Sequence, residues 1–161
     1  MDCGPLNIAF LHPNLGMGGA ERLVVDAASH LQTVGHQVTL FTTHHDRACC
    51  FAETRDGALA VRVYGDFLPS HIGQRLRAPC MIARMAYLVG AMTLRAGRFD
   101  VIFCDLISHT IPFLRLFSRA RIVFYCHFPD QLLTPPRHFL YRLYRGPIDR
   151  LEELTTGMAD R

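Results

Sequence analysis

The chain has 161 residues, of which 50% are hydrophobic and 19% charged, and this length and apolar content suit one domain with a single hydrophobic core. A disordered chain is excluded by the same composition. The 17 basic residues are all arginines, and they give a formal net charge of +3 without forming a basic stripe or tail. We therefore do not expect nucleic acid as a partner.

The cysteines and the first residues indicate a reducing compartment. Six cysteines include no Cys-x-x-Cys pair, and Cys104 and Cys126 lie in apolar runs where a free thiol behaves as a small hydrophobic group. The first apolar run has no basic segment before it and meets His12 and Pro13 after a few residues. It is therefore not expected to act as a secretory signal.

Short apolar runs alternate with helical patterns along the chain. A continuous apolar run predicts a buried parallel strand, because a strand covered on one face only would alternate with polar residues. The predicted strands cover residues 6–11, 37–42, 59–64, 100–105 and 121–126. The predicted helices cover residues 20–34, 77–94, 108–117 and 139–154. Right-handed crossovers then give an α/β fold, a Rossmann-like parallel sheet with helices on both faces.

A glycine-rich loop joins the first predicted strand to the first predicted helix. Gly16, Gly18 and Gly19 would permit positive φ angles and close approach to the backbone. The N-terminus of the next helix would then favour a phosphate or diphosphate, and a tight turn without a ligand is the alternative. The dinucleotide fingerprint would need a small residue in place of Glu21, so a nucleotide-dependent oxidoreductase is disfavoured.

Two histidines follow predicted strands at one edge of the sheet. His127 follows the strand at 121–126, and His12 follows the first strand. Ligands of parallel sheets lie outside the carboxyl ends of the strands, so His127 is expected beside a ligand, where it can exchange a proton. For His127 a structural role is the alternative. His12 is either a second site histidine or a strand cap.

The loop at residues 43–57 contains side chains that metal sites use. They are His44, His45, Asp46, Cys49 and Cys50. They share one loop, match no recognised ligand spacing and have no clear distant partner. We therefore expect no metal.

The apolar stretch at residues 77–94 is a candidate membrane contact. It is shorter than the ~20 residues of a membrane-spanning helix, and inserting its Arg84 would cost on the order of 3 kcal/mol. Flanking arginines would suit a helix in the headgroup plane, and a helix packed on the core is the alternative. The stretch is too apolar all round for a buried face to be identified.

Four longer strings resemble a known family. They are residues 8–28 with Gly-Gly-Ala-Glu-Arg, residues 125–134 with Tyr-Cys-His-Phe-Pro-Asp, residues 144–149, and residues 152–160 with Thr-Thr-Gly-Met-Ala-Asp. The first string marks the retaining GT-B glycosyltransferases of family 4. The others are similar to mannosyltransferases of the dolichol-linked oligosaccharide pathway of N-glycosylation.

This resemblance implies transfer of mannose from GDP-mannose to Man-GlcNAc2-PP-dolichol, first as an α1,3 and then as an α1,6 linkage, at the cytosolic face of the endoplasmic reticulum membrane. It implies that Gly16, Gly18 and Gly19 approach the donor diphosphate and that His127 is the catalytic residue beside the transferred sugar. Further candidates for sugar or acceptor contacts are Arg22, Asp130 and His12. Neither a metal nor a cofactor is implied.

The GT-B resemblance also implies a second Rossmann-like domain that holds the nucleotide and supplies a Glu-x7-Glu pair. The glutamates here are at positions 21, 53, 152 and 153, and no two are eight positions apart. We therefore expect residues 1–161 to be the N-terminal, acceptor-side domain, with the C-terminal donor domain absent and little activity alone. A non-catalytic module that binds lipid or protein is the alternative function.

Overall fold

The computed structural model describes residues 4–72, 76–127 and 139–160, with the backbone alone in residues 139–145. Five parallel strands form one sheet in the order β3-β2-β1-β4-β5. They are β1 (Asn7–His12), β2 (Gln37–Thr42), β3 (Ala60–Val63), β4 (Val101–Asp105) and β5 (Arg121–Tyr125). The predicted α/β, Rossmann-like sheet is confirmed, and its strand ends differ from the predicted ones by at most one residue.

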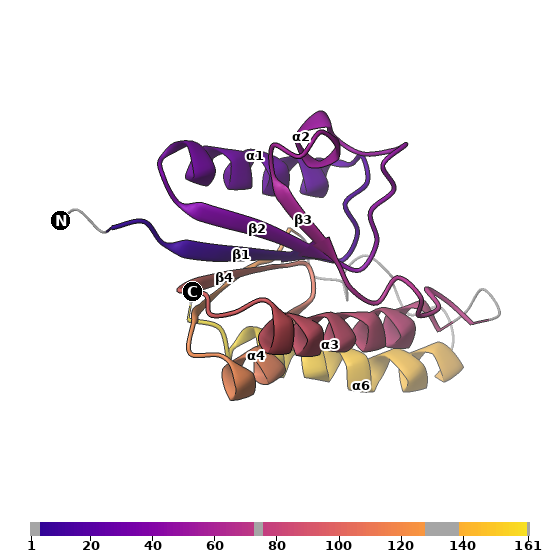
Figure 1. Cartoon of the computed structure of the whole chain (residues 1–161). Helices are drawn as coiled ribbons and strands as arrows, with labels where there is room; N and C mark the ends of the chain where they lie inside the picture. Colours follow the sequence, from indigo (N-terminus) through magenta and orange to yellow (C-terminus); the bar gives the residue numbers. More distant parts are fainter. Residues whose placement is uncertain (1–3, 73–75, 128–138, 161) are drawn as a thin grey trace.

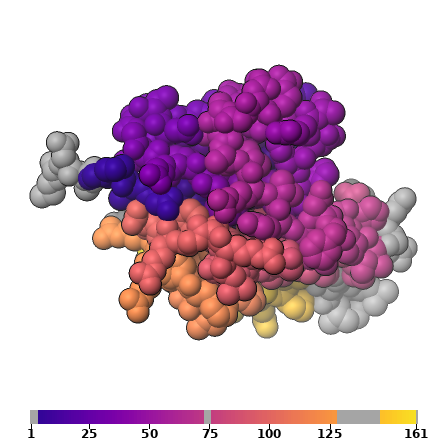
Figure 2. All heavy atoms as spheres, in the orientation of Figure 1, coloured from indigo at the N-terminus to yellow at the C-terminus, as the bar shows by residue number. Residues whose placement is uncertain are grey.

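Helices cover both faces of the sheet (Figure 1). One layer holds α1 (Gly19–Thr33) and the short α2 (Ala52–Arg55), which lies in a loop predicted to be irregular. The other layer holds α3 (Arg77–Arg95), α4 (Ile111–Phe117), which a 3-10 turn at Ser108–Thr110 precedes, and α6 (Phe139–Thr156). Figure 2 shows the two layers as one continuous body on this face.

Neighbouring residues of β1 supply the two halves of the core. Phe10 packs with Val24 and Val25 of α1, whereas Leu11 packs with Met85 and Leu88 of α3. Successive side chains of a strand point to opposite faces, so a strand covered on both sides needs apolar residues at every position. This explains why the strands are continuous apolar runs in the sequence.

The predicted end of α1 is confirmed at Gly35. This glycine has φ +99° and donates its backbone N–H to the carbonyl of Gln32. Only glycine adopts this left-handed conformation without steric cost, so it ends the helix and turns the chain toward β2.

Helix α3 packs one face on the core, which confirms the core-helix alternative for that face of residues 77–94, while membrane contact by the other face stays a prediction. Its buried face is well defined, contrary to the expectation that no face could be identified, and consists of Cys80, Arg84, Met85, Leu88, Val89, Ala91 and Met92. Among the described residues, no helix is both long enough and apolar enough to cross a bilayer.

The arginine that interrupts this apolar helix lies on its buried face. Nη2 of Arg84 donates to the carbonyl of Thr43 at 2.7 Å and to Oδ1 of Asp66 at 2.9 Å. Nη1 donates to the carbonyl of Leu68 at 3.1 Å. One guanidinium therefore holds the loops after β2 and β3 against α3, and these bonds compensate for its burial.

The last described residues return to the start of β5. Asp160 accepts the backbone N–H of Ile122 at 2.8 Å and the Nη2 of Arg115 at 2.8 Å. Both contacts hold the pKa of the Asp160 carboxyl below its usual value, the backbone bond more strongly. Thr155 donates to the hydroxyl of Ser108 at 2.8 Å. Two polar residues of the Thr-Thr-Gly-Met-Ala-Asp string thus hold α6 against the sheet.

Candidate active site

Three polar side chains meet where β1, β4 and β5 end. His12 is the last residue of β1, Asp105 is the last residue of β4, and His127 lies two residues beyond β5. Since β4 lies between β1 and β5, these ends are neighbours. The predicted positions of His12 and His127 at this edge are confirmed, and the structure adds Asp105 between them.

Asp105 contacts both histidines. Its Oδ2 lies 2.7 Å from Nδ1 of His12. The Nε2 of His127 lies 2.9 Å from Oδ1 and 3.1 Å from Oδ2 of the same carboxylate. The side chains of Asp105 and His12 are 0% and 2% exposed, while that of His127 is 23% exposed. His127 is therefore the member of this cluster that a ligand reaches most easily.

The backbone turns sharply directly after Asp105. Leu106 has φ +66°, an uncommon conformation for a residue with a branched side chain. The N–H of Ile107 donates to the carbonyl of Asp105, and the N–H of Leu106 donates to the carbonyl of Tyr125. The ring of Tyr125 meets that of His127 edge-on at 4.8 Å between centroids. The backbone turn after Asp105 is thus hydrogen-bonded to Tyr125, the residue whose ring packs against His127.

The glycine loop differs from the sequence prediction. Gly16, Gly18 and Gly19 do not have positive φ angles, so the expectation of left-handed backbone here is wrong. Gly18 instead is the N-cap of α1 with extended backbone, and the carboxylate of Glu21 fills the space that a Cβ would occupy there. Among the described residues, a Cβ at Gly16 would meet only ordinary contacts, and a Cβ at Gly19 would meet no atom within 4 Å.

Glu21 brings a negative charge to the N-terminus of α1. Its Oε1 lies 3.8 Å from Nε2 of His12, so it extends the histidine and aspartate cluster toward the glycine loop. A helix N-terminus favours an anion, and here the anion is a carboxylate of the same helix. The approach of a donor diphosphate to Gly18 stays a prediction, and it requires the Glu21 side chain to turn away.

Arg22 points away from the histidine cluster. Its Nη2 donates to Glu53 at 2.8 Å, its Nε donates to Asp26 at 2.9 Å, and its guanidinium lies over the ring of Phe51 at 4.6 Å. The bond to Asp26, followed by that to Glu53, raises the pKa of Arg22 further. The structure therefore does not bring Arg22 to His127. Asp130 lies outside the described residues.

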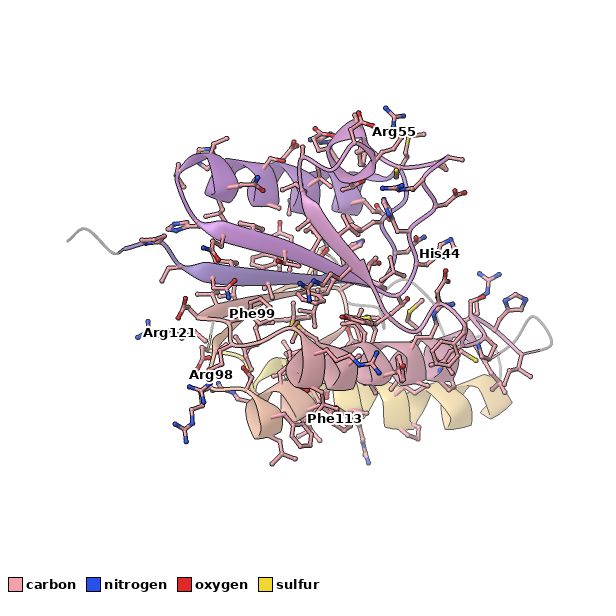
Figure 3. The ribbon with its side chains drawn as sticks, viewed as in Figure 1. His44, Arg55, Arg98, Phe99, Phe113 and Arg121 are labelled. Carbon is pink, nitrogen blue, oxygen red and sulfur yellow. The ribbon has the colours of Figure 1, made fainter. Side chains whose placement is uncertain are left out.

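The histidines and cysteines of residues 43–57 do not converge on one point. Nδ1 of His44 lies 2.8 Å from Oδ1 of Asp66, and Nε2 of His45 lies 3.2 Å from the hydroxyl of Thr54. Burial lowers the pKa of His45. Figure 3 shows His44 beyond the ends of β2 and β3. Within the described ranges, no three histidine, cysteine or acidic side chains are placed to hold a metal ion.

A cavity of about 960 Å³ lies at the other edge of the sheet, where β1, β4 and β5 begin. Its lining includes Arg98, Phe99 and Arg121. Figure 3 shows Arg98 and Arg121 pointing outward from this edge. The cavity is therefore separate from the histidine cluster, and it belongs to the end of a parallel sheet that rarely binds substrates.

The family model "Glycosyltransferase Family 4" matches residues 17–161. The chain belongs to glycosyltransferase family 4. Three similar proteins are named alpha-1,3/1,6-mannosyltransferase ALG2. The protein from Rhizomucor pusillus is 53% identical over 96% of this chain and 34% of its own length. The human protein is 52% identical over 96% of this chain and 38% of its own length. The Saccharomyces cerevisiae protein is 46% identical over 95% of this chain and 31% of its own length.

Solved structures share the fold of this family 4 chain at low sequence identity. A glycosyltransferase of kitacinnamycin is 16% identical with a TM-score of 0.55, and the match covers 89% of this chain and 34% of that protein. The glycosyltransferase UGT2 of Phytolacca americana is 13% identical with a TM-score of 0.50, covering 96% of this chain and 36% of that protein. These likenesses support the sheet and its helices alone. The chain spans 31–38% of the length of the ALG2 proteins described above.

Proposed function

We propose that this chain is the acceptor-side domain of a retaining α-1,3/1,6-mannosyltransferase. The reaction transfers mannose from GDP-mannose to Man-GlcNAc2-PP-dolichol, making an α1,3 and then an α1,6 linkage. The observation that carries the proposal is an identity of 46–53% to proteins of that name over nearly the whole chain. The cluster of His12, Asp105 and His127 at the ligand-binding edge of the sheet supports it.

The chemistry of this cluster suits a sugar. Sugar hydroxyls both donate and accept hydrogen bonds, and imidazole and carboxylate groups in fixed orientations match them. His127 would contact the transferred mannose, because its ring is the more exposed of the two histidines. The buried carboxylate of Asp105 lies directly behind that ring, and its negative charge would favour the positive charge that develops on a sugar carbon as the leaving group departs.

The proposed reaction uses no metal and no cofactor. The leaving diphosphate needs positive charge or hydrogen-bond donors, and a helix N-terminus next to Gly18 and Gly19 supplies backbone N–H groups. Glu21 would turn away from Gly18 when the diphosphate enters. Mannose transfer in the presence of a chelator at an unchanged rate is the expected result, and a rate restored only by added divalent ions would contradict this part of the proposal.

We also propose that the protein works at the cytosolic face of the endoplasmic reticulum membrane, where its lipid acceptor would lie. Large apolar side chains are exposed on the helices of the α3 side, and they are Leu94, Leu116, Phe117 and Leu154. Arg95, Arg98 and Arg119 lie near the ends of α3 and α4 and are exposed. Apolar side chains next to arginines suit contact with an anionic membrane surface. Within residues 77–94, only the outer face, such as Tyr87 and Leu94, is free for this contact.

The substrates are tested with a protein that has the length of its relatives and carries this domain. It is incubated with labelled GDP-mannose or UDP-glucose and a mannosyl-chitobiosyl diphosphate lipid, and the product is digested with linkage-specific mannosidases. Transfer from GDP-mannose alone, with α1,3 and α1,6 linkages in the product, is the expected result. Binding of the lipid without any transfer would favour the alternative of a non-catalytic lipid-binding module.

A further inference from the structure

We propose that Asp105 is a positioning residue that fixes the orientation and the tautomer of both His12 and His127, leaving Nδ1 of His127 for the ligand. The contacts themselves are independent of any reaction. The consequence for catalysis rests on the function proposed above, and the experiments below separate the two.

The carboxylate of Asp105 determines where the two histidines carry their protons. An aspartate carboxylate only accepts hydrogen bonds, and the side chain of Asp105 is 0% exposed, so water does not supply donors freely. The donors are Nδ1 of His12 at 2.7 Å and Nε2 of His127 at 3.1 Å, both to Oδ2 of the carboxylate. Each nitrogen must therefore carry a proton. His12 is held with its proton on Nδ1, and His127 is held with its proton on Nε2.

The second nitrogen of each ring then has a defined environment. Nε2 of His12 faces the carboxylate of Glu21 at 3.8 Å inside the protein. Nδ1 of His127 belongs to a ring that is 23% exposed. A ring whose far nitrogen is anchored by a carboxylate presents its near nitrogen in a fixed direction, which is how histidines are oriented in many active sites. His127 thus presents Nδ1, and His12 serves as the second anchor of Asp105.

A second observation separates this arrangement from ordinary core packing. The residue after Asp105 is Leu106, whose φ of +66° is uncommon for a non-glycine residue. Backbone in sparsely populated conformations gathers at sites where side chains must be aimed. The hydrogen bond from Leu106 to the carbonyl of Tyr125 joins this turn to the segment that carries His127. The backbone at Leu106 therefore helps to hold Asp105 and His127 in the orientation in which their side chains meet.

The tautomers are measured directly by long-range ¹H–¹⁵N NMR of the imidazole rings in this chain. We expect His12 with the proton on Nδ1 and His127 with the proton on Nε2. The exposed His30 serves as the reference for a ring without this anchor. His12 and His127 both carrying the average, rapidly exchanging signature of a free imidazole would overturn the proposal, and this result needs no variant.

The catalytic consequence is measured with Asp105→Asn in the full-length protein. Asparagine removes the negative charge, and its NH2 group in the place of Oδ1 would set one donor against the Nε2–H of His127, so we expect kcat to fall about 10- to 100-fold with a much smaller change in KM. Asp100→Asn is the matched control, because Asp100 precedes the same strand and its side chain accepts the N–H of Asn7 at the opposite edge. An unchanged kcat in Asp105→Asn would contradict the positioning role.

Two outcomes distinguish this inference from the proposed function. If the expected tautomers are found but the full-length protein transfers no mannose, the positioning of His127 stands and the proposed reaction fails. If mannose is transferred while the tautomers differ from those expected, the reaction stands and the positioning fails. His12→Gln is a second variant should Asp105→Asn not fold, and we expect it to keep the proton of His127 on Nε2.

Discussion

The carboxylate of Glu21 occupies the space that a side chain at residue 18 would need, so Gly18 and Glu21 form a matched pair at the N-terminus of α1. The same carboxylate faces His12 at 3.8 Å. The glycine loop is therefore connected to the histidine cluster through one side chain, and a change at residue 18 should reach the cluster through Glu21.

Replacing Gly18 tests this pair. In Gly18→Ala the new methyl group meets the end of a flexible side chain, so we expect a loss of stability of only about 1 kcal/mol, with Glu21 displaced from His12. The NMR signals of the His12 ring should shift and mannose transfer by the full-length protein should slow. Gly19→Ala is the control, because a Cβ there meets no atom of the described part of the chain within 4 Å. Equal behaviour of the two variants would show that Gly18 has no special role.

Replacing His127 tests the candidate catalytic residue. We expect His127→Ala in the full-length protein to lower kcat about 100- to 1,000-fold, because a group that exchanges protons or stabilises charge at the reacting centre is lost. Circular dichroism should be unchanged, since the ring is partly exposed. His30→Ala removes an exposed histidine and should leave kcat as it is. Unaltered transfer by His127→Ala would remove this residue from the site.

Arg84 carries a stability prediction. Arg84→Met keeps the apolar part of the side chain but leaves the carbonyls of Thr43 and Leu68 without their donor, so we expect a loss on the order of 3 kcal/mol in the free energy of unfolding. Urea denaturation measures the loss. The exposed Arg95 is the control, and Arg95→Ala should change stability by less than about 0.5 kcal/mol. Similar denaturation curves for both variants would contradict the role given to Arg84.

The ionised carboxylate of Asp160 is expected to stabilise the fold at neutral pH but not in acid. Its pKa is lowered in the folded state by the N–H of Ile122 and then by Arg115, so the folded form holds this proton less tightly than the unfolded chain. The stabilisation is present above the usual carboxyl pKa of about 4 and is lost as the pH falls through the lower folded-state value. Asp160→Asn should therefore be less stable than the parent chain at pH 7, and the difference should shrink toward pH 2. A difference that does not depend on pH would rule out this linkage.

Cysteine reactivity tests the burial of β4. Burial raises the pKa of the Cys104 thiol to about 12, so this thiol stays protonated at neutral pH. Since the thiolate is the reactive form, iodoacetamide should modify the exposed Cys49 and leave Cys104 unmodified until urea unfolds the chain. Peptide mapping by mass spectrometry reads both sites in one sample. Early modification of Cys104 would mean that β4 opens in the native state.

The strands and their burial on both faces can be predicted from the sequence, because each strand is a continuous apolar run. Residues 101–104 between Asp100 and Asp105 are an example. The site follows only in part. His12 and His127 are predicted by their places after strands, but Asp105 is indistinguishable in sequence from any acid that ends a strand. Asp105 contacts both histidines because β4 lies between β1 and β5, and this strand order is seen only in the tertiary structure. An acid directly after an apolar strand was the signal available.

Arg84 and the glycine loop show the same limit. An arginine within an apolar helix reads as an interruption, and its burial depends on carbonyl groups from loops that are 16 and 41 residues away in sequence. Three glycines before a helix indicate flexible backbone, whereas the structure uses Gly18 to make room for Glu21. Helical spacing and glycine content report local preference, and neither reports which distant group fills a space.

Mannose transfer by two chains shows whether this domain belongs to a two-domain mannosyltransferase. Residues 1–161 alone and the same residues within a protein of the relatives' full length are each incubated with labelled GDP-mannose and a mannosyl-chitobiosyl diphosphate lipid. We expect the full-length protein to form labelled lipid and residues 1–161, although folded, to form none, because the donor must be held by a second domain. Absence of transfer by a folded full-length protein that binds the lipid would contradict the proposed mannosyltransferase function.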